Sequence, residues 1–376
     1  MYRPPIDRDP HETRGADRKV VSGNPKAPKN QSMKIPKKQR NVSSKNTLPP
    51  PPKAPKVFNP LKVLVGDVVP IAIDKFNESN YSYLIKTSNT SCILVDPSDP
   101  SLVLKKAESL NLTPSHILVT HNHEDHAGGS LEIIQHCLGC EVISSKIDNV
   151  KGMTKSMTHM EELTVGSVTV RAMLTQGHTK GHLCYYITNK MKTGANVNTP
   201  PFIFTGDTLF LGGCGKLTQG SATQMASSLL LLSRLPAHTL VYPGHEYTRS
   251  NLIFARGVEP DNNFIHEKLR AIEGKACTVP GTIGDELQTN VFIRAANKTS
   301  LPSLGLNVSC LDITNPNEFV RLLREAKNKF KPTPQQMVVN TNNFDGFAEA
   351  SDGNDDPGAA AMAAAASGNV PMETEI

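Results

Sequence analysis

The chain has 376 residues, 38% of them hydrophobic, which is long enough for two folded domains. Its formal net charge is +5, but residues 1–57 hold 14 Lys and Arg against 4 Asp and Glu and leave the remaining residues net acidic. The basicity therefore gives no argument for nucleic-acid binding by the folded body. The 7 scattered Cys residues do not form the pattern of a disulfide framework. No apolar run approaches the roughly 20 residues of a membrane-spanning helix.

Both ends of the chain have the composition of disordered tails. Residues 1–57 are rich in Lys and Pro, and residues 341–376 are acidic and rich in Ala and Gly. Neither can bury enough apolar surface to offset the entropy lost on ordering. The first residues lack the apolar stretch of a signal peptide, and acidic residues among them disfavour a mitochondrial presequence. We expect a cytoplasmic protein, with a mitochondrial or nuclear location left open.

Between the tails, the body begins with short strands and then alternates strands with helices. β-rich runs bounded by turn residues predict strands at 63–73, 83–86, 92–95, 115–120, 141–144, 167–173, 182–187, 201–205 and 239–242. Helical spacing predicts helices at 101–110, 129–138 and 221–235. This mixed order, repeated in two halves, predicts an α/β fold with helices that cover two packed sheets.

After residue 247 the pattern becomes mostly helical. Helices are predicted at 251–256, 264–274 and 317–330, the last with Asn315 as its N-cap and Pro316 at its first position. The body therefore divides into a mixed domain at 58–247 and a smaller helical domain at 248–340.

The residues that carry chemistry begin directly after the predicted strand at 115–120. The segment THNHEDH at 120–126 holds three imidazoles and two carboxylates. Alternate side chains of an extended segment share a face, so His121 and His123 can point at one metal ion. A turn then directs Asp125 and His126 toward a neighbouring point. Neutral imidazole and carboxylate are ligands that borderline cations such as zinc prefer.

Three more metal-competent residues follow, each at the end of a predicted strand. They are His178 in GHTKGH, Asp207 in FTGDT and His245 in PGHEY. Loops carried by rigid strands are where catalytic groups are usually presented. Four concordant segments therefore predict a metal site rather than a polar surface loop.

In this order and spacing the segments resemble the metallo-β-lactamase superfamily and, within it, glyoxalase II (hydroxyacylglutathione hydrolase). The resemblance runs from about Leu61 to Lys331. The HxHxDH motif is specific for the superfamily, whereas GCGK at 213–216, GHEYT at 244–248 and the helical carboxy-terminal part indicate glyoxalase II. The resemblance implies a metallo-β-lactamase αββα sandwich as the catalytic domain at 58–247. It also implies that the helical domain at 248–340 binds substrate.

The resemblance implies a centre of two divalent metal ions, zinc first, with iron or manganese as alternatives. Seven side chains would hold them, the first three on one ion, the next three on the other, and the last between both: His121, His123 and His178; Asp125, His126 and His245; Asp207. Asp125, His126 and Asp207 are also the expected catalytic residues. A water shared by the two ions would become a hydroxide near neutral pH and attack a thioester carbonyl. The leaving thiolate has a conjugate pKa of about 8.5 and needs no strong general acid.

The implied substrate is an S-(2-hydroxyacyl)glutathione, split into glutathione and a 2-hydroxy acid. Glutathione carries carboxylates, which Lys and Arg bind. The positions that match the family's substrate contacts are Lys216, Tyr247, Asn251, Arg324 and Lys327. Thr218 departs from the family, which has a hydrogen-bonding aromatic residue there, and 298–313 fits the family pattern poorly. We expect a monomer without membrane or nucleic-acid partners.

Three other functions stay open at this point. A persulfide dioxygenase of the superfamily also binds glutathione but uses a single iron held by two His and one Asp, and it typically lacks a histidine at the position of His245. A nuclease would need a basic patch with interleaved aromatic residues, which the body lacks. A scaffold that has lost turnover would retain the ligands without catalysis. His182 is expected to support a ligand loop, and Asp96 either supports a ligand or caps a turn.

Overall fold

The computed structural model of the protein describes residues 63–75, 79–189, 200–297 and 315–332. The described residues all belong to one unit of the chain, Asn59–Ile376. The predicted tails at 1–57 and 341–376 and the poorly fitting segment at 298–313 lie outside the described residues. Within the described ranges, no helix is both long and apolar enough to cross a bilayer.

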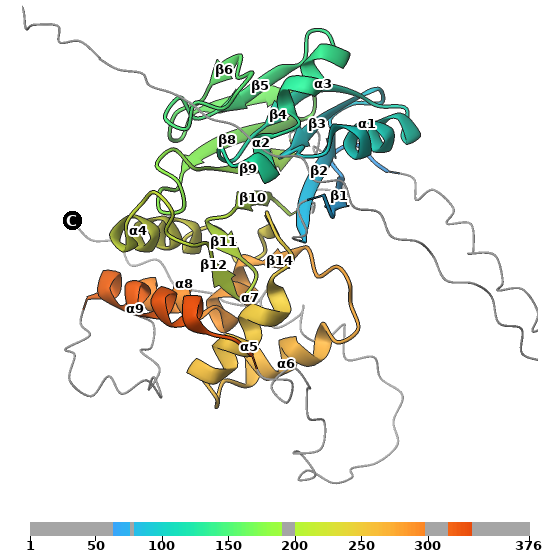
Figure 1. Cartoon of the computed structure of the whole chain (residues 1–376). Helices are drawn as coiled ribbons and strands as arrows, with labels where there is room; N and C mark the ends of the chain where they lie inside the picture. The colour runs from blue at the N-terminus through green and yellow to red at the C-terminus, as the bar shows by residue number, and fades with distance from the viewer. Residues whose placement is uncertain (1–62, 76–78, 190–199, 298–314, 333–376) are drawn as a thin grey trace, which may run out of the picture. The chain divides into compact units, whose positions relative to one another are not determined.

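The first half of this unit forms a six-stranded sheet in the order β1-β2-β3-β4-β5-β6 (Figure 1). β1, β2 and β3 pair antiparallel, and β3 to β6 run parallel. Two helices, α1 (Pro100–Ser109) and α3 (Ser130–His136), lie in the connections between parallel strands. The strands are β1 (Val68–Ile73), β2 (Asn80–Lys86), β3 (Ser91–Val95), β4 (Thr113–Leu118), β5 (Glu141–Ser144) and β6 (Lys155–Ser156).

The second half forms another six-stranded sheet, in the order β14-β13-β10-β9-β8-β7. β10 and β13 run parallel, and α4 (Ala222–Ser233) and a small hairpin of β11 (Leu209–Phe210) and β12 (Gly213–Cys214) lie between them in the chain. The other pairs are antiparallel. The strands are β7 (Glu162–Val165), β8 (Val168–Leu174), β9 (Leu183–Asn189), β10 (Phe202–Gly206), β13 (Leu240–Pro243) and β14 (Gly281–Thr282).

Strand alternation explains the four layers. In β3, Ile93 and Val95 pack into the core between the sheets, whereas Cys92 and Leu94 pack against α1 and α3. The second sheet is arranged in the same way, with its outer face against α4 and the carboxy-terminal helices. Successive side chains of a strand point to opposite faces, so strands that are apolar at every position need cover on both sides. The result is the helix–sheet–sheet–helix sandwich that the sequence predicts.

In the described part of the chain after β13 there are five helices, as the helical pattern after residue 247 predicts. α9 begins as expected, because the Asn315 side chain accepts a hydrogen bond from the backbone N–H of Asn317 and Pro316 is the first helical residue. Its buried Phe319 and Leu323 join the apolar core of α4 and α8. The helices are α5 (Thr248–Val258), α6 (Asn263–Ala271), α7 (Ile283–Thr289), α8 (Val291–Asn297) and α9 (Pro316–Lys329).

The sequence prediction was wrong mainly for short elements. The strand expected from residue 63 begins only at Val68, and the turn expected after His123 is a short helix, α2 (Glu124–Ala127). β6, β7, β11, β12, β14, α7 and α8 were not predicted. Strands of two to four residues and helices of seven residues are too short to show a clear hydrophobic period.

The parallel strand pairs determine where a site can form. β3 and β4 end at the same edge of the first sheet, and β10 and β13 end at the same edge of the second. An isolated bridge between Asn80 and His245 joins the two sheets here, with the backbone N–H of Tyr81 donating to the Gly244 carbonyl at 2.8 Å. Loops beyond the carboxyl ends of parallel strands commonly form binding sites.

Candidate metal centre

The loop after β4 carries four of the seven predicted ligands. His121 is buried, and His123 occupies the N-cap position of α2. The single helical turn that follows places Asp125 and His126 on the inner side of the loop, and it leaves Glu124 exposed. A tight turn thus separates one pair of ligands from the other within six residues.

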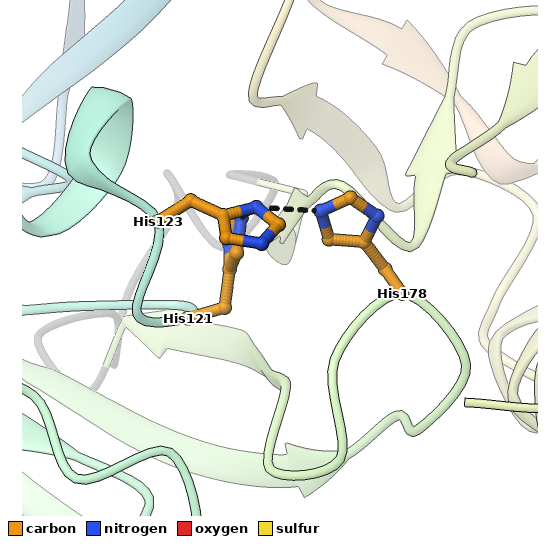
Figure 2. Close-up of side chains that lie close together, drawn as sticks. All are labelled: His121, His123 and His178. Atoms are coloured by element: carbon orange, nitrogen blue, oxygen red, sulfur yellow. Dashed lines mark hydrogen bonds between the residues drawn. The ribbon is translucent and has the colours of Figure 1, made fainter. Parts of the chain in front are cut away.

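His121, His123 and His178 form the first cluster. Figure 2 shows their rings turned toward one another, His178 coming from the loop between β8 and β9. Nδ1 of His123 lies 3.1 Å from Nε2 of His121 and 3.0 Å from Nε2 of His178. Tetrahedral nitrogen ligands about 2.0–2.1 Å from a zinc ion lie about 3.3 Å apart. The three nitrogens therefore suit one cation.

Asp125, His126 and His245 form the second cluster, with His245 contributed by the loop after β13. Nε2 of His126 and Nε2 of His245 are 3.3 Å apart. Oδ2 of Asp125 lies 3.4 Å from Nε2 of His245 and 3.6 Å from Nε2 of His126. These spacings again match the edges of a coordination polyhedron around one divalent ion.

Asp207, directly after β10, lies between the two clusters. Its Oδ1 is 3.3 Å from Nε2 of His126 and 3.4 Å from Nε2 of His245, and its Oδ2 is 3.5 Å from Nε2 of His178. Oδ1 is buried and receives no hydrogen bond of normal geometry from the described residues. A buried carboxylate oxygen without a donor is costly, so this atom suits a cation ligand.

Hydrogen bonds behind the rings set the tautomer of two predicted ligands. Nδ1 of His126 donates to Oδ2 of Asp96 at 2.9 Å, and Nδ1 of His178 donates to the backbone carbonyl of Lys216 at 2.8 Å. Both acceptors lack a proton to give, so Nδ1 carries the hydrogen and Nε2 presents its lone pair to the cluster. Asp96 also accepts from the backbone N–H and hydroxyl of Thr120.

His182 lies behind Asp207 rather than in either cluster. Its Nε2 accepts a hydrogen bond from the backbone N–H of Asp207 at 3.1 Å, and its ring stacks on His121 with centroids 5.1 Å apart. Burial lowers the pKa of His182 well below its usual value. A neutral His182 thus supports the loop that carries Asp207.

The ionisable groups of the clusters are tuned by burial and by one another. Burial lowers the pKa of His121 and of His178, so both imidazoles are neutral near pH 7, as metal ligation requires. Burial raises the pKa of Asp207, but the imidazoles of His245 and His126 outweigh it and hold the pKa well below its usual value. For His245, burial lowers the pKa, and the carboxylates of Asp207 and Asp125 outweigh it and raise the pKa to about 9.

Close packing at the centre requires a glycine before His245. A Cβ on Gly244 would lie 2.6 Å from Oδ1 of Asp207 and 2.6 Å from Cε1 of His126. Real Cβ atoms do not approach other atoms so closely, and both neighbours belong to the clusters. The glycine in GHEYT therefore lets the β13 loop approach Asp207 and His126.

Lys216, Thr218 and Tyr247 each contact a predicted ligand residue. Lys216 and Thr218 are exposed after β12, and the Thr218 hydroxyl donates to the backbone carbonyl of His178. The Tyr247 ring stacks on His245, with centroids 4.7 Å apart and planes 3° apart. Thr218, which stands where the family has an aromatic residue, thus holds the loop that carries the predicted ligand His178.

Asn251, Arg324 and Lys327 connect the carboxy-terminal helices to the same region. Asn251 is buried, and its side-chain amide donates to the Leu211 carbonyl at 3.2 Å. Nη1 of Arg324 donates to the Cys214 carbonyl at 2.6 Å, so Arg324 lies against the GCGK segment. Nζ of Lys327 donates to the Ser250 carbonyl at 2.8 Å.

Comparison with known proteins finds two matching family models and several similar proteins. A family model described as metallo-beta-lactamase superfamily matches residues 77–245, and one described as hydroxyacylglutathione hydrolase C-terminus matches residues 246–330. The chain is 39% identical over 261 residues to a cytoplasmic hydroxyacylglutathione hydrolase of Arabidopsis thaliana, covering 68% of this chain and 96% of that protein.

The chain belongs to the hydroxyacylglutathione hydrolase family of the metallo-beta-lactamase superfamily. A hydroxyacylglutathione hydrolase of Rhodospirillum rubrum is 39% identical over 236 residues, which cover 60% of this chain and 87% of that protein. Among solved structures, ETHE1 from Myxococcus xanthus aligns with a TM-score of 0.48 and 24% identity over 72% of this chain and 94% of that one.

The sequence did not indicate one buried carboxylate that supports a predicted ligand loop. Asp148, in the loop between β5 and β6, is buried and hydrogen-bonds to the segment that follows His178. It stands 22 residues after the nearest predicted ligand and in no recognisable motif. No signal of spacing or composition marks it, because its partners become neighbours only in the folded chain.

Proposed function

We propose that this protein hydrolyses S-(2-hydroxyacyl)glutathione thioesters to glutathione and a 2-hydroxy acid at a centre of two divalent cations. Membership of the hydroxyacylglutathione hydrolase family supports the reaction class. The observation that carries the proposal is the convergence of seven metal-competent side chains from four separate segments, with Asp207 between the two clusters.

The donor set supports zinc in both positions, because imidazole nitrogens and carboxylate oxygens are ligands that zinc prefers. Iron and manganese accept the same ligands. The seven proposed ligands are His121, His123, Asp125, His126, His178, Asp207 and His245. Bound there, the two cations would polarise the thioester carbonyl and lower the pKa of a water between them.

The chain's own contribution is to hold these donors in place and to orient their protons. Asp96 and the Lys216 carbonyl keep the protons of His126 and His178 on the nitrogens that face away from the clusters. Asp207 presents one oxygen to each cluster, and Asp125 and His126 complete the catalytic set. The product thiolate leaves without a proton donor, because a thiol with a pKa of about 8.5 is a good leaving group.

Cationic and polar groups beside the centre support glutathione as the carrier of the acyl group. Lys216, Arg324 and Lys327 provide positive charge for its carboxylates. The stacking of Tyr247 on His245 brings the base of the phenol ring close to the second cluster. Asn251 holds the Leu211 carbonyl and through it the hairpin that precedes Lys216. We assign substrate binding to these five residues.

The purified full chain provides the test. Metal analysis is expected to find two divalent ions per chain, and thiol release from S-lactoylglutathione should depend on them. Chelation should abolish turnover, and zinc should restore it. A protein that holds two ions but releases no thiol from this substrate would refute the proposed reaction. Consumption of oxygen with glutathione persulfide and one iron per chain would indicate a dioxygenase instead.

The cytoplasm is the proposed location. The relative from Arabidopsis thaliana is named as a cytoplasmic enzyme, which supports the same compartment here. Microscopy of the tagged full chain measures it directly. The expected monomer stays a prediction, which gel filtration with light scattering can check.

A further inference from the structure

The loop between β5 and β6 contains a buried carboxylate, Asp148, that forms no ion pair with any Lys, Arg or His in the described ranges. Its side chain and backbone are 4% exposed. Oδ2 accepts a hydrogen bond from the Thr179 hydroxyl at 2.6 Å, and Oδ1 accepts one from the backbone N–H of Gly181 at 2.7 Å. A buried carboxylate without a counter-charge is costly unless hydrogen bonds compensate it. The hydrogen bonds to Thr179 and Gly181 therefore compensate for the burial of Asp148 and attach it to this segment.

The segment that Asp148 holds is the one that follows His178. Thr179 is fully buried, and Gly181 approaches so closely that a Cβ there would lie 2.6 Å from both the backbone nitrogen and Oδ1 of Asp148. The two bonds flank Lys180 and clamp the loop within three residues of the His178 ring. Rotation of this loop would carry the His178 imidazole with it.

A third hydrogen bond connects Asp148 to the other half of the first cluster. The Asn122 side-chain amide donates to the Asp148 backbone carbonyl at 3.0 Å. Asn122 stands between His121 and His123 in the chain. One residue thus joins the two separate loops that provide all three nitrogens of the first cluster, and none of its bonds reaches Asp125, His126 or His245.

We infer that Asp148 is a positioning residue for the first cation, because it holds the His178 loop in register with the His121–His123 loop. The inference rests on the proposed two-cation centre. Asp148 does not contact the cation ligands through its carboxylate, so it acts through Thr179, Gly181 and Asn122. Its effect should be selective for one of the two cations. The His178 ring keeps a second anchor at the Lys216 carbonyl, so the loss should be partial.

The test is cobalt(II) and zinc(II) titration of the chelated full chain, followed by calorimetry and by the visible spectrum of the cobalt form. Asp148→Ala should lower the affinity for one cation by about 10–100-fold, the usual effect of removing a group that supports a ligand. The affinity for the other cation should stay within about twofold of the wild type. Thr179→Val, which keeps the shape of the side chain and removes the hydroxyl, should lower the affinity for the same cation by a smaller factor. Asp148→Asn should recover most of the affinity, because its oxygen still accepts from Gly181 and its amide can donate to the Thr179 hydroxyl.

Two comparisons assign the effect to the first cluster. In a His178→Ala background, Asp148→Ala should add no further loss, since both changes act on one donor. Lys151→Ala, an exposed change in the same loop, should match the wild type. The inference would be overturned by an equal loss of affinity for both cations or by additive losses with His178→Ala. Unchanged affinities in Asp148→Ala and Thr179→Val would overturn it as well. A wild type that binds one cation would overturn both this inference and the proposed centre. Two cations without thioester hydrolysis would remove only the proposed function.

Discussion

The metal centre and the two basic side chains of α9, Arg324 and Lys327, differ in whether their polar atoms are already hydrogen-bonded within the protein. In the metal centre, which comprises the seven proposed ligands, nitrogens and carboxylate oxygens face one another 3.0 to 3.6 Å apart. On α9, Arg324 donates to the Cys214 carbonyl and Lys327 to the Ser250 carbonyl. The first arrangement presents donors with the spacing that a cation between them requires. The second is satisfied within the protein before any substrate arrives.

This difference separates two kinds of functional residue. Changes in the metal centre should affect metal content and kcat with modest effect on the rest of the fold. Changes on α9 should affect both KM and stability, because Arg324 and Lys327 also attach the helix to the loops beside the centre. Mutants can therefore distinguish a residue committed to chemistry from one that shares its bonds with the fold.

The largest effect is expected for Asp207→Asn. Its carboxylate faces both clusters, and its loss should lower kcat/KM by roughly 10³-fold, since the charge stabilisation by metal ions is worth several kcal/mol. Metal analysis should find fewer than two ions per chain. Asp261→Asn makes the same chemical change at an exposed position and should behave as the wild type. Full activity with two bound ions in Asp207→Asn would contradict the bridging assignment.

Asp96→Asn should produce the next largest effect. Asp96 adopts a positive φ of 47°, which asparagine tolerates better than most residues, so the fold should persist. The weaker acceptor would hold the Nδ1 proton of His126 less firmly, and affinity for the second cation should fall by about 10–100-fold. Competition with a chelator measures this loss. An unchanged affinity would show that Asp96 serves only the turn that contains it.

Arg324→Ala should lower stability and raise KM together. Arg324 is 6% exposed and donates to the Cys214 carbonyl, and a hydrogen bond from a charged donor is worth about 1.5–3 kcal/mol. Urea unfolding and steady-state kinetics measure the two effects. Arg321→Ala on the same helix removes only surface ion pairs with Glu318 and Glu325, and it should leave the urea midpoint and KM nearly unchanged. A KM effect without loss of stability would place Arg324 in substrate binding alone.

The smallest predicted effect is a pH dependence of KM. Burial, followed by the nearby charge of Arg324, lowers the pKa of Lys327 to about 8. Lys327 is therefore charged below this pH and loses its charge as the pH rises through it. KM for an anionic glutathione thioester should rise several-fold above pH ~8, while kcat should not follow the same titration. Lys327→Arg should remove this rise, and Lys329→Arg, at an exposed position, should retain it. The same rise in Lys327→Arg would assign it to another group.

Much of the fold could be predicted because it follows from local patterns. Unbroken apolar runs such as 92–95 identify strands buried on both faces, and the Asn315–Pro316 pair identifies the start of α9. Short elements such as β14, of two residues, could not be found in this way. They form because neighbouring strands supply hydrogen-bond partners rather than because their own residues favour extended structure.

The residue types and spacing of His121 to His245 determined the chemistry, since few other functions need imidazoles and carboxylates at the ends of four strands. Only the folded chain decided how those donors are supported. The carboxylate of Asp148 holds the loop after His178, and the Cys214 carbonyl occupies Arg324. These contacts join residues more than 30 and 100 positions apart. A sequence specifies local conformation and ligand type directly, whereas contacts between distant loops depend on how the two sheets pack.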